Sequence, residues 1–289
     1  SRRRHTRCSR DWSSDVCSSD LYFNGYVDDV RITNGVARYL YNFSPPNAAF
    51  YNIGASSFSA AGTDSYFGQT SLLLHGDGTN AGQNNTFLDG STNAFTITRH
   101  GNTTQGSFSP FSKPDGYWSN YFDGSSALTY SSTSPSIGTS DFTFECWYYP
   151  TSSSTTHNLF QIGGIVTGAF EVFFDRTAEG QSANKICLNT YGGSRIDSNT
   201  SIPLNQWTHV AILRISGTMY IYLNGILDKS ASYTDNFSAA GNMAVGREGT
   251  YNGAYIYGYV SNLRLVVGNS VYSSNFTPST TPLTAVEIG

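Results

Sequence analysis

The chain is poor in charged residues and contains no long apolar run. Asp, Glu, Lys and Arg make up 12% of its 289 residues, about half the share found in an average soluble protein. No stretch approaches the roughly 18 consecutive apolar residues that a membrane-spanning helix needs. A membrane span is therefore not predicted.

Cysteine is also scarce. Of the four cysteines, Cys8 and Cys17 lie in the first 21 residues, whereas Cys146 and Cys187 lie in the apolar, strand-like stretches FECWYY and KICLN. Cysteines in such stretches are usually buried. Two buried thiols are therefore favoured over a single disulfide, and because both alternatives stay open, the redox compartment is undetermined.

The only cluster of basic residues is the opening segment, SRRRHTRCSRDWSSDVCSSDL. It lacks the apolar stretch of a secretory signal and the close-spaced ligand pairs of a zinc site. Back-translation of residues 1–7 and 11–20 in one reading frame gives strings that resemble the two constant parts of an indexed sequencing adapter. We predict that residues 1–21 are an artefactual, non-native segment. Without its five Arg and three Asp the net charge changes from −4 to −6, and no basic surface for nucleic acid or an anionic membrane remains.

Residues 22–45 repeat the pattern of residues 255–278. The first stretch is YFNGYVDDVRITNGVARYLYNFSP and the second is YIYGYVSNLRLVVGNSVYSSNFTP, at a constant offset of 233 residues. A period of this length is typical of tandem domains rather than of a short-period solenoid. The repeat predicts four parts: the artefactual segment 1–21, the C-terminal fragment of a preceding copy in 22–46, an Ala-, Ser- and Gly-rich linker in 47–70, and one complete domain in 71–289.

The complete copy alternates between two sets of side chains with the period of a β-strand. In DFTFECWYYP, every second residue from Phe142 to Tyr148 lies on one face, and the residues between them lie on the other. The stretches WTHVAILRI and TMYIYLNGIL follow, joined by Ser216-Gly217, and Asn224-Gly225 marks a second tight turn. No long stretch carries the apolar stripe of a helix. The pattern predicts an all-β, antiparallel β-sandwich.

Several stretches occur in an order that is typical of one family. They are SLLLHGDGTN, NYFDGSSALTYS, DFTFECWYYP, QWTHVAILR with YIYLNGIL, NMAVGRE and GYVSNLRLVVG, and they span nearly all of residues 71–278. In this order they resemble the laminin-G-like, concanavalin A-like lectin/glucanase domains. The resemblance implies a two-sheet antiparallel jelly-roll β-sandwich. The tandem, Gly-, Ser- and Thr-rich character is similar to that of domains in phage tail-fibre and bacterial surface proteins, which implies a virion or an extracellular, cell-surface location.

Because the resembled family includes glucanases, the residues must be tested for catalysis. A retaining glycosidase needs two carboxylates about 5–5.5 Å apart. Glu145 stands alone in its strand, and Glu171 and Asp175 in EVFFD are four residues apart, about 13 Å along an ideal strand. His209 in WTHVAI is expected to be a packed strand residue, and no histidine beyond residue 21 lies near a nucleophile-elbow motif. A non-catalytic domain is expected, with a glucanase-type glycoside hydrolase as an alternative.

Sugar binding has more candidate residues. Proteins hold sugars through aromatic faces against C–H surfaces and through amides, carboxylates and Arg side chains that hydrogen-bond the hydroxyls. The predicted ligand-binding residues lie in turn-like surroundings and are Trp118, Tyr191, Arg195 and Tyr251. We therefore predict a carbohydrate-binding adhesion module of a virion tail fibre or cell-surface protein. Its expected partners are a polysaccharide or glycoconjugate and further copies of the same domain; a structural spacer without a ligand is the alternative.

Calcium is the candidate cofactor. It prefers oxygen ligands from carboxylates, amides and carbonyls, often on loops. The stretches HGDGTN and FLDGSTN offer Asp77, Asp89 and Asn93, and domains of the resembled family often bind calcium at a rim of the sandwich. Both Asp residues precede Gly, and a plain turn explains this arrangement fully. The turn alone is the favoured interpretation, with a calcium site as the alternative.

Overall fold

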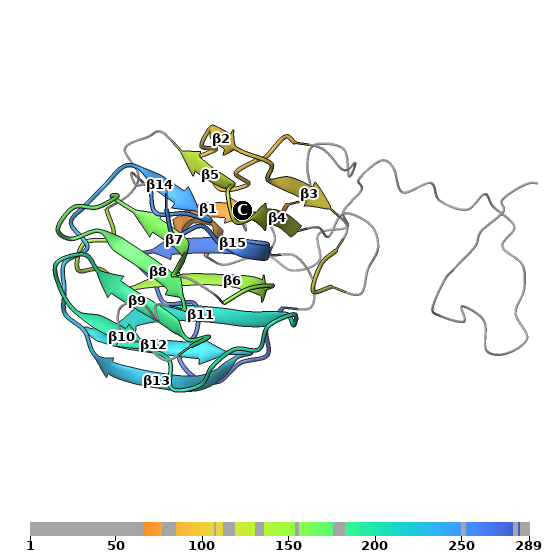
Figure 1. Cartoon of the computed structure of the whole chain (residues 1–289). Coiled ribbons are helices and arrows are strands. Elements are labelled where there is room, and N and C mark those ends of the chain that lie inside the picture. The colour runs from red at the N-terminus through yellow and green to blue at the C-terminus, as the bar shows by residue number, and fades with distance from the viewer. Residues whose placement is uncertain are drawn as a thin grey trace, which may run out of the picture. The chain divides into compact units, whose positions relative to one another are not determined.

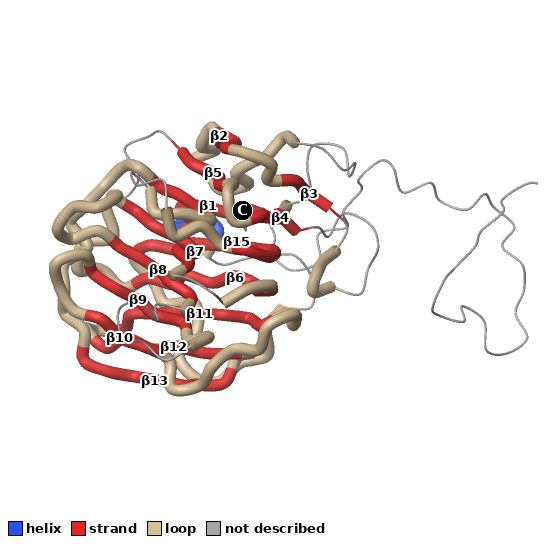
Figure 2. The backbone as a smooth tube through the Cα atoms, viewed as in Figure 1, coloured by secondary structure: helices blue, strands red, loops and turns tan. Residues whose placement is uncertain are grey.

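Strands account for nearly all of the regular structure. The computed structural model describes residues 66–76, 85–106, 108–111, 119–130, 136–153, 156–175, 183–249, 253–279 and 283. All of them belong to one unit, Ile53–Gly289. In the described residues the only helix is a single 3-10 turn, Phe67–Gln69, and no helix is long and apolar enough to cross a membrane (Figure 2). The predicted segments 1–21 and 22–46, and the linker up to residue 65, lie outside the described residues.

The strands form two antiparallel sheets (Figure 1). The eight-stranded sheet has the order β13 (Ile226–Ser232), β12 (Thr218–Leu223), β11 (Thr208–Ile215), β6 (Phe142–Pro150), β15 (Tyr257–Val267), β4 (Ser119–Asp123) and β3 (Thr104–Gly106), with β1 (Thr70–Leu74) also paired to β15. The seven-stranded sheet has the order β10 (Arg195–Asp197), β9 (Ile186–Thr190), β8 (Phe170–Phe174), β7 (His157–Ile162), β14 (Met243–Val245), β5 (Ala127–Tyr130) and β2 (Ile97–His100). Neighbouring strands are often far apart in sequence, as expected of a jelly roll.

The core lies between the sheets and is rich in phenylalanine. Phe142 and Phe144 from β6 are fully buried, as is Phe160 from β7. The rings of Phe144 and Phe160 stack at 5.0 Å across the two sheets, and the rings of Phe142 and Phe170 meet edge to face at 5.3 Å. Burial of one such side chain contributes roughly 1.5–3 kcal/mol. The alternation predicted for β6 is confirmed, and so is the two-sheet antiparallel β-sandwich.

Two tight turns predicted from the sequence connect β11, β12 and β13. Ser216 and Gly217 have φ of 48° and 77°, and Asn224 and Gly225 have φ of 52° and 77°. Each pair lies between two directly paired strand residues. Two-residue hairpin turns with positive φ at both positions match the twist of antiparallel strands, which explains the choice of Gly and Asn. Both turns are confirmed.

The two cysteines of the domain are free and buried. Cys146 lies in β6 and Cys187 in β9, so they belong to different sheets. Burial raises the pKa of the Cys146 thiol, and the Glu145 charge raises it further. The favoured alternative of two buried thiols is confirmed.

A C-terminal strap, defined as residues 268–279, covers part of the outer face of the eight-stranded sheet. The Val271 N–H donates to Thr143 Oγ1 at 2.9 Å, and the Phe276 N–H donates to the Gly225 carbonyl at 2.9 Å. The rings of Tyr272 and Phe276 stack at 3.5 Å. Tyr272 and Phe276 also pack on a small apolar cluster of that face. The strap therefore covers part of the outer face of the eight-stranded sheet. The outer face of the seven-stranded sheet differs, because it carries polar side chains.

Candidate functional site

A row of polar side chains crosses the outer face of the seven-stranded sheet. The intervening residues of the same strands, such as Leu128, Val172 and Leu188, belong to the core. Side chains directly opposite each other on paired strands share a face. We call the following set the polar row. From β5 to β10 it consists of Thr129, Ala244, Gln161, Glu171, Asn189 and Arg195.

Glu171 lies in the middle of the polar row and is held by two amides. Its Oε1 accepts a hydrogen bond from Gln161 Nε2 at 2.6 Å, and its Oε2 accepts one from Asn189 Nδ2 at 2.5 Å. Gln161 is itself fixed, because its Nε2 also donates to the Gly164 carbonyl at 3.0 Å and its Oε1 accepts from the Gly249 N–H. Only 1% of Glu171 is exposed. The centre of the row is thus a fixed set of polar groups rather than a mobile one.

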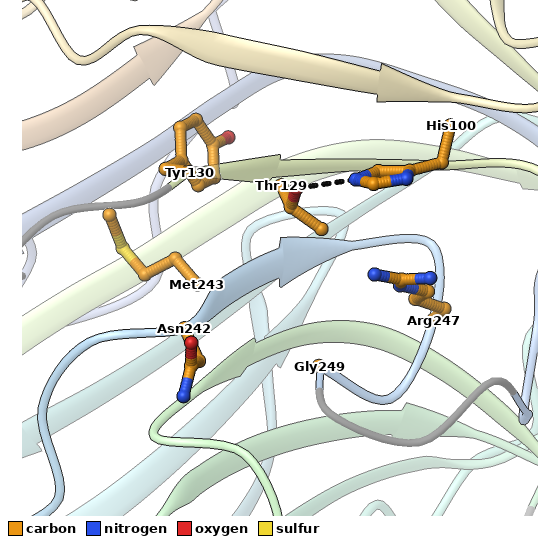
Figure 3. A pocket seen from close by; sticks show the side chains of 7 residues that line it. All are labelled: His100, Thr129, Tyr130, Asn242, Met243, Arg247 and Gly249. Carbon is orange, nitrogen blue, oxygen red and sulfur yellow. Dashed lines mark hydrogen bonds between the residues drawn. The ribbon is translucent and has the colours of Figure 1, made fainter.

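One end of the row is hollow. Ala244 contributes only a methyl group between Thr129 and Gln161, and a pocket of about 170 Å³ lies at this end (Figure 3). This volume is below the roughly 300–1,000 Å³ of pockets for drug-sized ligands and suits a single ring. The residues that line it are His100, Thr129, Tyr130, Asn242, Met243, Arg247 and Gly249.

Arg247 gives the pocket a positive charge, and His100 adds an imidazole. A ring nitrogen of His100, Nε2, lies 2.7 Å from Thr129 Oγ1 (Figure 3). Burial lowers the pKa of His100, and the positive charge of Arg247 lowers it further. The second effect requires the two side chains to lie close enough to repel each other.

Tyr191 and Arg195 lie together at the other end of the row. They flank the turn between β9 and β10, in which the Thr190 N–H donates to the Ser194 carbonyl at 2.9 Å. The Tyr191 side chain is 38% exposed. Arg195 lies opposite Asn189 and pairs with Asp197 at 3.2 Å. The structure therefore brings two of the four predicted ligand-binding residues to one hairpin; Trp118 and Tyr251 lie outside the described residues.

Asp89 and Asn93, proposed above for calcium, are engaged in fastening a loop to β1. Asp89 Oδ1 accepts from the N–H groups of Leu73 at 3.0 Å and Ser91 at 2.9 Å. Its Oδ2 accepts from Ser91 Oγ at 2.8 Å and from the Phe95 N–H at 3.0 Å. Asn93 Nδ2 donates to the Ser71 carbonyl at 3.0 Å. Four donors use about the full accepting capacity of a carboxylate, so a turn accounts for Asp89 without a metal.

The calcium hypothesis stays a prediction. Asp77, its third residue, lies outside the described residues. Within the described part of the chain, no three His, Cys, Asp or Glu side chains gather closely enough to hold a metal ion.

Glu145 lies on the outer face of the other sheet and is engaged by three side chains. Arg264 Nε donates to its Oε1 at 2.8 Å, His209 Nε2 lies 3.2 Å from its Oε2, and the Tyr272 hydroxyl donates to Oε2 at 2.9 Å. Burial alone would raise the pKa of Glu145, but the charge of Arg264 and the contact with His209 outweigh it and lower the pKa to about 2. His209 is packed in its strand, as predicted. Glu145 is thus a fixed anion beneath the strap.

The other histidines have separate surroundings. His157 is fully buried and lies against the ring of Phe174 at 5.8 Å. Burial lowers its pKa to about 4. His75 Nε2 lies 2.6 Å from the Leu283 carbonyl oxygen. Among the histidines of the described residues, only His100 lines the pocket.

A second surface, an aromatic row on the eight-stranded sheet, was not anticipated from the sequence. Tyr121 in β4, Tyr259 in β15 and Tyr149 in β6 lie on neighbouring strands, and Trp207, just before β11, continues the row. Their ring centroids are 4.9, 5.8 and 5.4 Å apart in that order. Phe108 lies on them, 4.7 Å from Tyr259. Tyr121 is 36% exposed and Phe108 is 44% exposed. Aromatic rings on alternate strand positions were the available signal, but the alignment between strands could not be read from the chain.

Comparison with known proteins places the fold in a family. A model of the concanavalin A-like lectin/glucanases superfamily matches residues 122–268. Domain 4 of AbnA, a GH43 extracellular arabinanase from Geobacillus stearothermophilus solved with arabinotriose, is 17% identical, with a TM-score of 0.51 over 69% of this chain and 93% of that chain. No curated protein sequence matches significantly.

A second solved structure has a similar fold. It is a botulinum neurotoxin type C structure, described by the dependence of cell entry on interaction with two ganglioside molecules. It is 13% identical to this chain, with a TM-score of 0.50 over 70% of this chain and 48% of that one. The chain thus spans about half of the toxin structure. At these identities both likenesses concern the fold.

Proposed function

Because this chain belongs to the concanavalin A-like lectin/glucanase superfamily, we propose that it is a non-catalytic carbohydrate-binding module whose sugar lies on the polar row. The observation that carries the proposal is the set of fixed amide and carboxylate groups on the outer face of the seven-stranded sheet. Gln161 and Glu171 are buried at the centre of the row. The groups of the row that can hydrogen-bond a sugar directly are Thr129 and Asn189, which are partly exposed, and Arg195, which is exposed.

The two ends of the row supply the remaining elements of a sugar site. Tyr191 offers an exposed ring at one end, where the C–H face of a sugar can stack. The pocket beside Thr129 offers a recess for one ring at the other end. Because Gln161 and Asn189 hold Glu171 in place, the polar groups lose little freedom when a ligand binds.

The arrangement of carboxylates supports a binding role rather than glycoside hydrolysis. A retaining glycosidase needs two carboxylates about 5–5.5 Å apart. The polar row contains one, Glu171, and both of its oxygens accept amide hydrogen bonds. Glu145 lies on the other sheet with a strongly lowered pKa, which makes it a poor proton donor. Hydrolysis of a glucan remains the alternative to be tested.

The biological setting follows from the same proposal. AbnA domain 4 was solved with arabinotriose and belongs to an extracellular enzyme, and the botulinum neurotoxin interacts with gangliosides. We place this domain in an adhesion protein of a cell surface or virion tail fibre, with a polysaccharide or glycoconjugate as its partner. The repeat at residues 22–45 supports tandem copies, in which weak single-site affinities combine through a high effective concentration.

A glycan array followed by calorimetry tests the proposal. Wild-type protein is compared with Asn189→Ala and Tyr191→Ala on the polar-row side, and with Tyr121→Ala on the opposite sheet as the matched control. The loss of one neutral hydrogen bond to the sugar, about 0.5–1.5 kcal/mol, weakens binding roughly twofold to tenfold. We expect this loss for Asn189→Ala, a smaller one for Tyr191→Ala, and none for Tyr121→Ala.

Each other outcome decides against part of the proposal. Loss of binding in Tyr121→Ala alone would move the site to the aromatic row. Release of reducing ends from a β-glucan would identify a hydrolase. If no glycan binds at all, the domain is a structural spacer.

A further inference from the structure

The geometry points to an acidic glycan as the ligand: the pocket at the Thr129 end of the polar row selects a sugar that carries a carboxylate. This inference rests on the proposed function, since it names the class of sugar for the same site. Two residues of the pocket wall carry it. They are His100, at the end of β2, and Arg247, in the segment after β14.

Arg247 is the charged residue among the seven that line the pocket. His100 adds an imidazole, and none of the seven is Asp or Glu. Thr129 adds a hydroxyl and Asn242 an amide (Figure 3). Arg, His and amide donors are the groups with which proteins bind carboxylates. A neutral sugar would use only part of this set.

Three carboxylates near the pocket need to be considered. Asp89 lies close enough to the lining residue Tyr130 for its charge to raise the pKa of Tyr130, after burial, but its oxygens accept four hydrogen bonds from the loop and β1. Glu171 is separated from the Ala244 position by Gln161 in the row, which places its strand about 10 Å away at two strand spacings. Its two oxygens accept hydrogen bonds from Gln161 and Asn189. Glu248 follows Arg247 in the chain but does not line the pocket. The lining therefore carries the positive charge of Arg247 and no carboxylate, although carboxylates lie in the neighbourhood.

Arg247 supplies the positive charge of the pocket wall. The pKa of His100 is lowered by burial and by the charge of Arg247, which favours the neutral imidazole. An anion bound beside Arg247 gains charge-assisted hydrogen bonds, and its own charge favours protonation of His100. Because the pocket of about 170 Å³ suits a single ring, we expect the acidic group to be carried by that ring.

Matched oligosaccharides separate the acidic group from the rest of the sugar. The probes are α2,3-sialyllactose with lactose, and trigalacturonate with galactotriose, titrated into the full chain at low salt. We expect the acidic member of at least one pair to bind about tenfold more tightly or better. The preference should shrink as salt is added, because charges near the surface are screened.

Variants locate the preference in the pocket. Arg247→Gln should abolish the difference between the two members of a pair, because it weakens binding of the acidic member more than binding of the neutral member. His100→Gln, which retains a group able to bond Thr129, should reduce the difference. Arg195→Gln, at the far end of the row, is the control and should retain the preference. Thermal unfolding of each variant checks that it folds, and Glu248→Gln checks that Glu248 does not set the preference.

The outcomes distinguish this inference from the proposed function. Equal affinity for acidic and neutral members, with binding still weakened by Asn189→Ala, would overturn the acidic ligand and leave carbohydrate binding in place. A preference that is lost in Arg195→Gln but kept in Arg247→Gln would also overturn it. Displacement of the acidic sugar by an equal concentration of inorganic phosphate would show a simple anion site. Failure to bind any sugar in either series or on the array would overturn both proposals.

Discussion

Replacement of Arg264 by methionine should show that Glu145 is a structural anion. Arg264 is 2% exposed and donates two hydrogen bonds to Glu145, which is itself 1% exposed. Removing one partner of such a buried pair leaves an uncompensated charge and costs about 3–5 kcal/mol. The lowered pKa of Glu145 gives a similar free energy. Its fall from 4.5 to about 2 on folding corresponds to about 3 kcal/mol of stability.

The pH dependence makes the test specific. Because the pKa of Glu145 is lowered in the folded protein, its contribution is fully present above pH 4.5 and is lost as the pH falls toward 2. In Arg264→Met the Glu145 carboxylate stays buried but loses its main counter-charge. Protonation of Glu145 at low pH removes the uncompensated charge and so reduces the loss of stability in the variant. The difference in unfolding free energy between wild type and variant should therefore be largest near pH 7 and should narrow below pH 5.

Urea denaturation at pH 7, 5 and 4 measures this difference. Arg195→Met is the matched control, because Arg195 forms an exposed ion pair with Asp197 and such pairs contribute about 0–1 kcal/mol. A loss below about 1 kcal/mol for Arg264→Met at pH 7, or a loss that does not change with pH, would refute the reasoning.

Three further predictions concern other parts of the fold. Gly225→Ala should lower stability by more than about 2 kcal/mol, because a Cβ there would lie 1.9 Å from the Phe276 carbonyl oxygen at a φ of 77°. Urea denaturation measures the loss, with Gly106→Ala as the control because the space around its Cβ is open. Equal effects of the two substitutions would contradict the packing of the strap. The buried thiols, including Cys146 with its raised pKa, should react with a thiol reagent only after unfolding, and rapid labelling of the native protein would contradict their burial. Asp89→Ala should cost about 2–4 kcal/mol with or without calcium, since it removes four hydrogen bonds; a calcium-induced rise in the thermal midpoint of wild type that the variant lacks would instead favour the metal site.

The sequence was sufficient for features that depend on neighbours along the chain. The alternation in β6 predicted which side chains enter the core, and Ser216-Gly217 predicted a hairpin because only residues tolerant of positive φ suit that turn. The burial of His209 followed from its apolar strand. These features depend on the alternation of residues along a strand or on a local turn. Both can be recognised from the order of residues in the sequence.

The candidate site could not be predicted in the same way because it is built across strands. Glu171 was considered with Asp175, its neighbour along the chain, whereas its contacts are Gln161 and Asn189 on the two flanking strands. The register of those strands depends on the packing of the whole sandwich. Likewise, Arg264 and Tyr272 meet Glu145 only after β15 and the strap have docked. Tyr191 and Arg195 could be predicted to lie together because one hairpin holds both; their role in binding stays a prediction.

The central claim is that sugar binds to the polar row of the seven-stranded sheet, and amide chemical-shift mapping tests it most directly. The ¹⁵N-labelled chain is titrated with the oligosaccharide that the array and calorimetry rank highest. We predict that the largest shifts occur at Gln161, Asn189 and Gly249 and in the hairpin at Tyr191. Shifts confined to the strands that carry Tyr121 and Tyr259, with none on the seven-stranded sheet, would contradict the account.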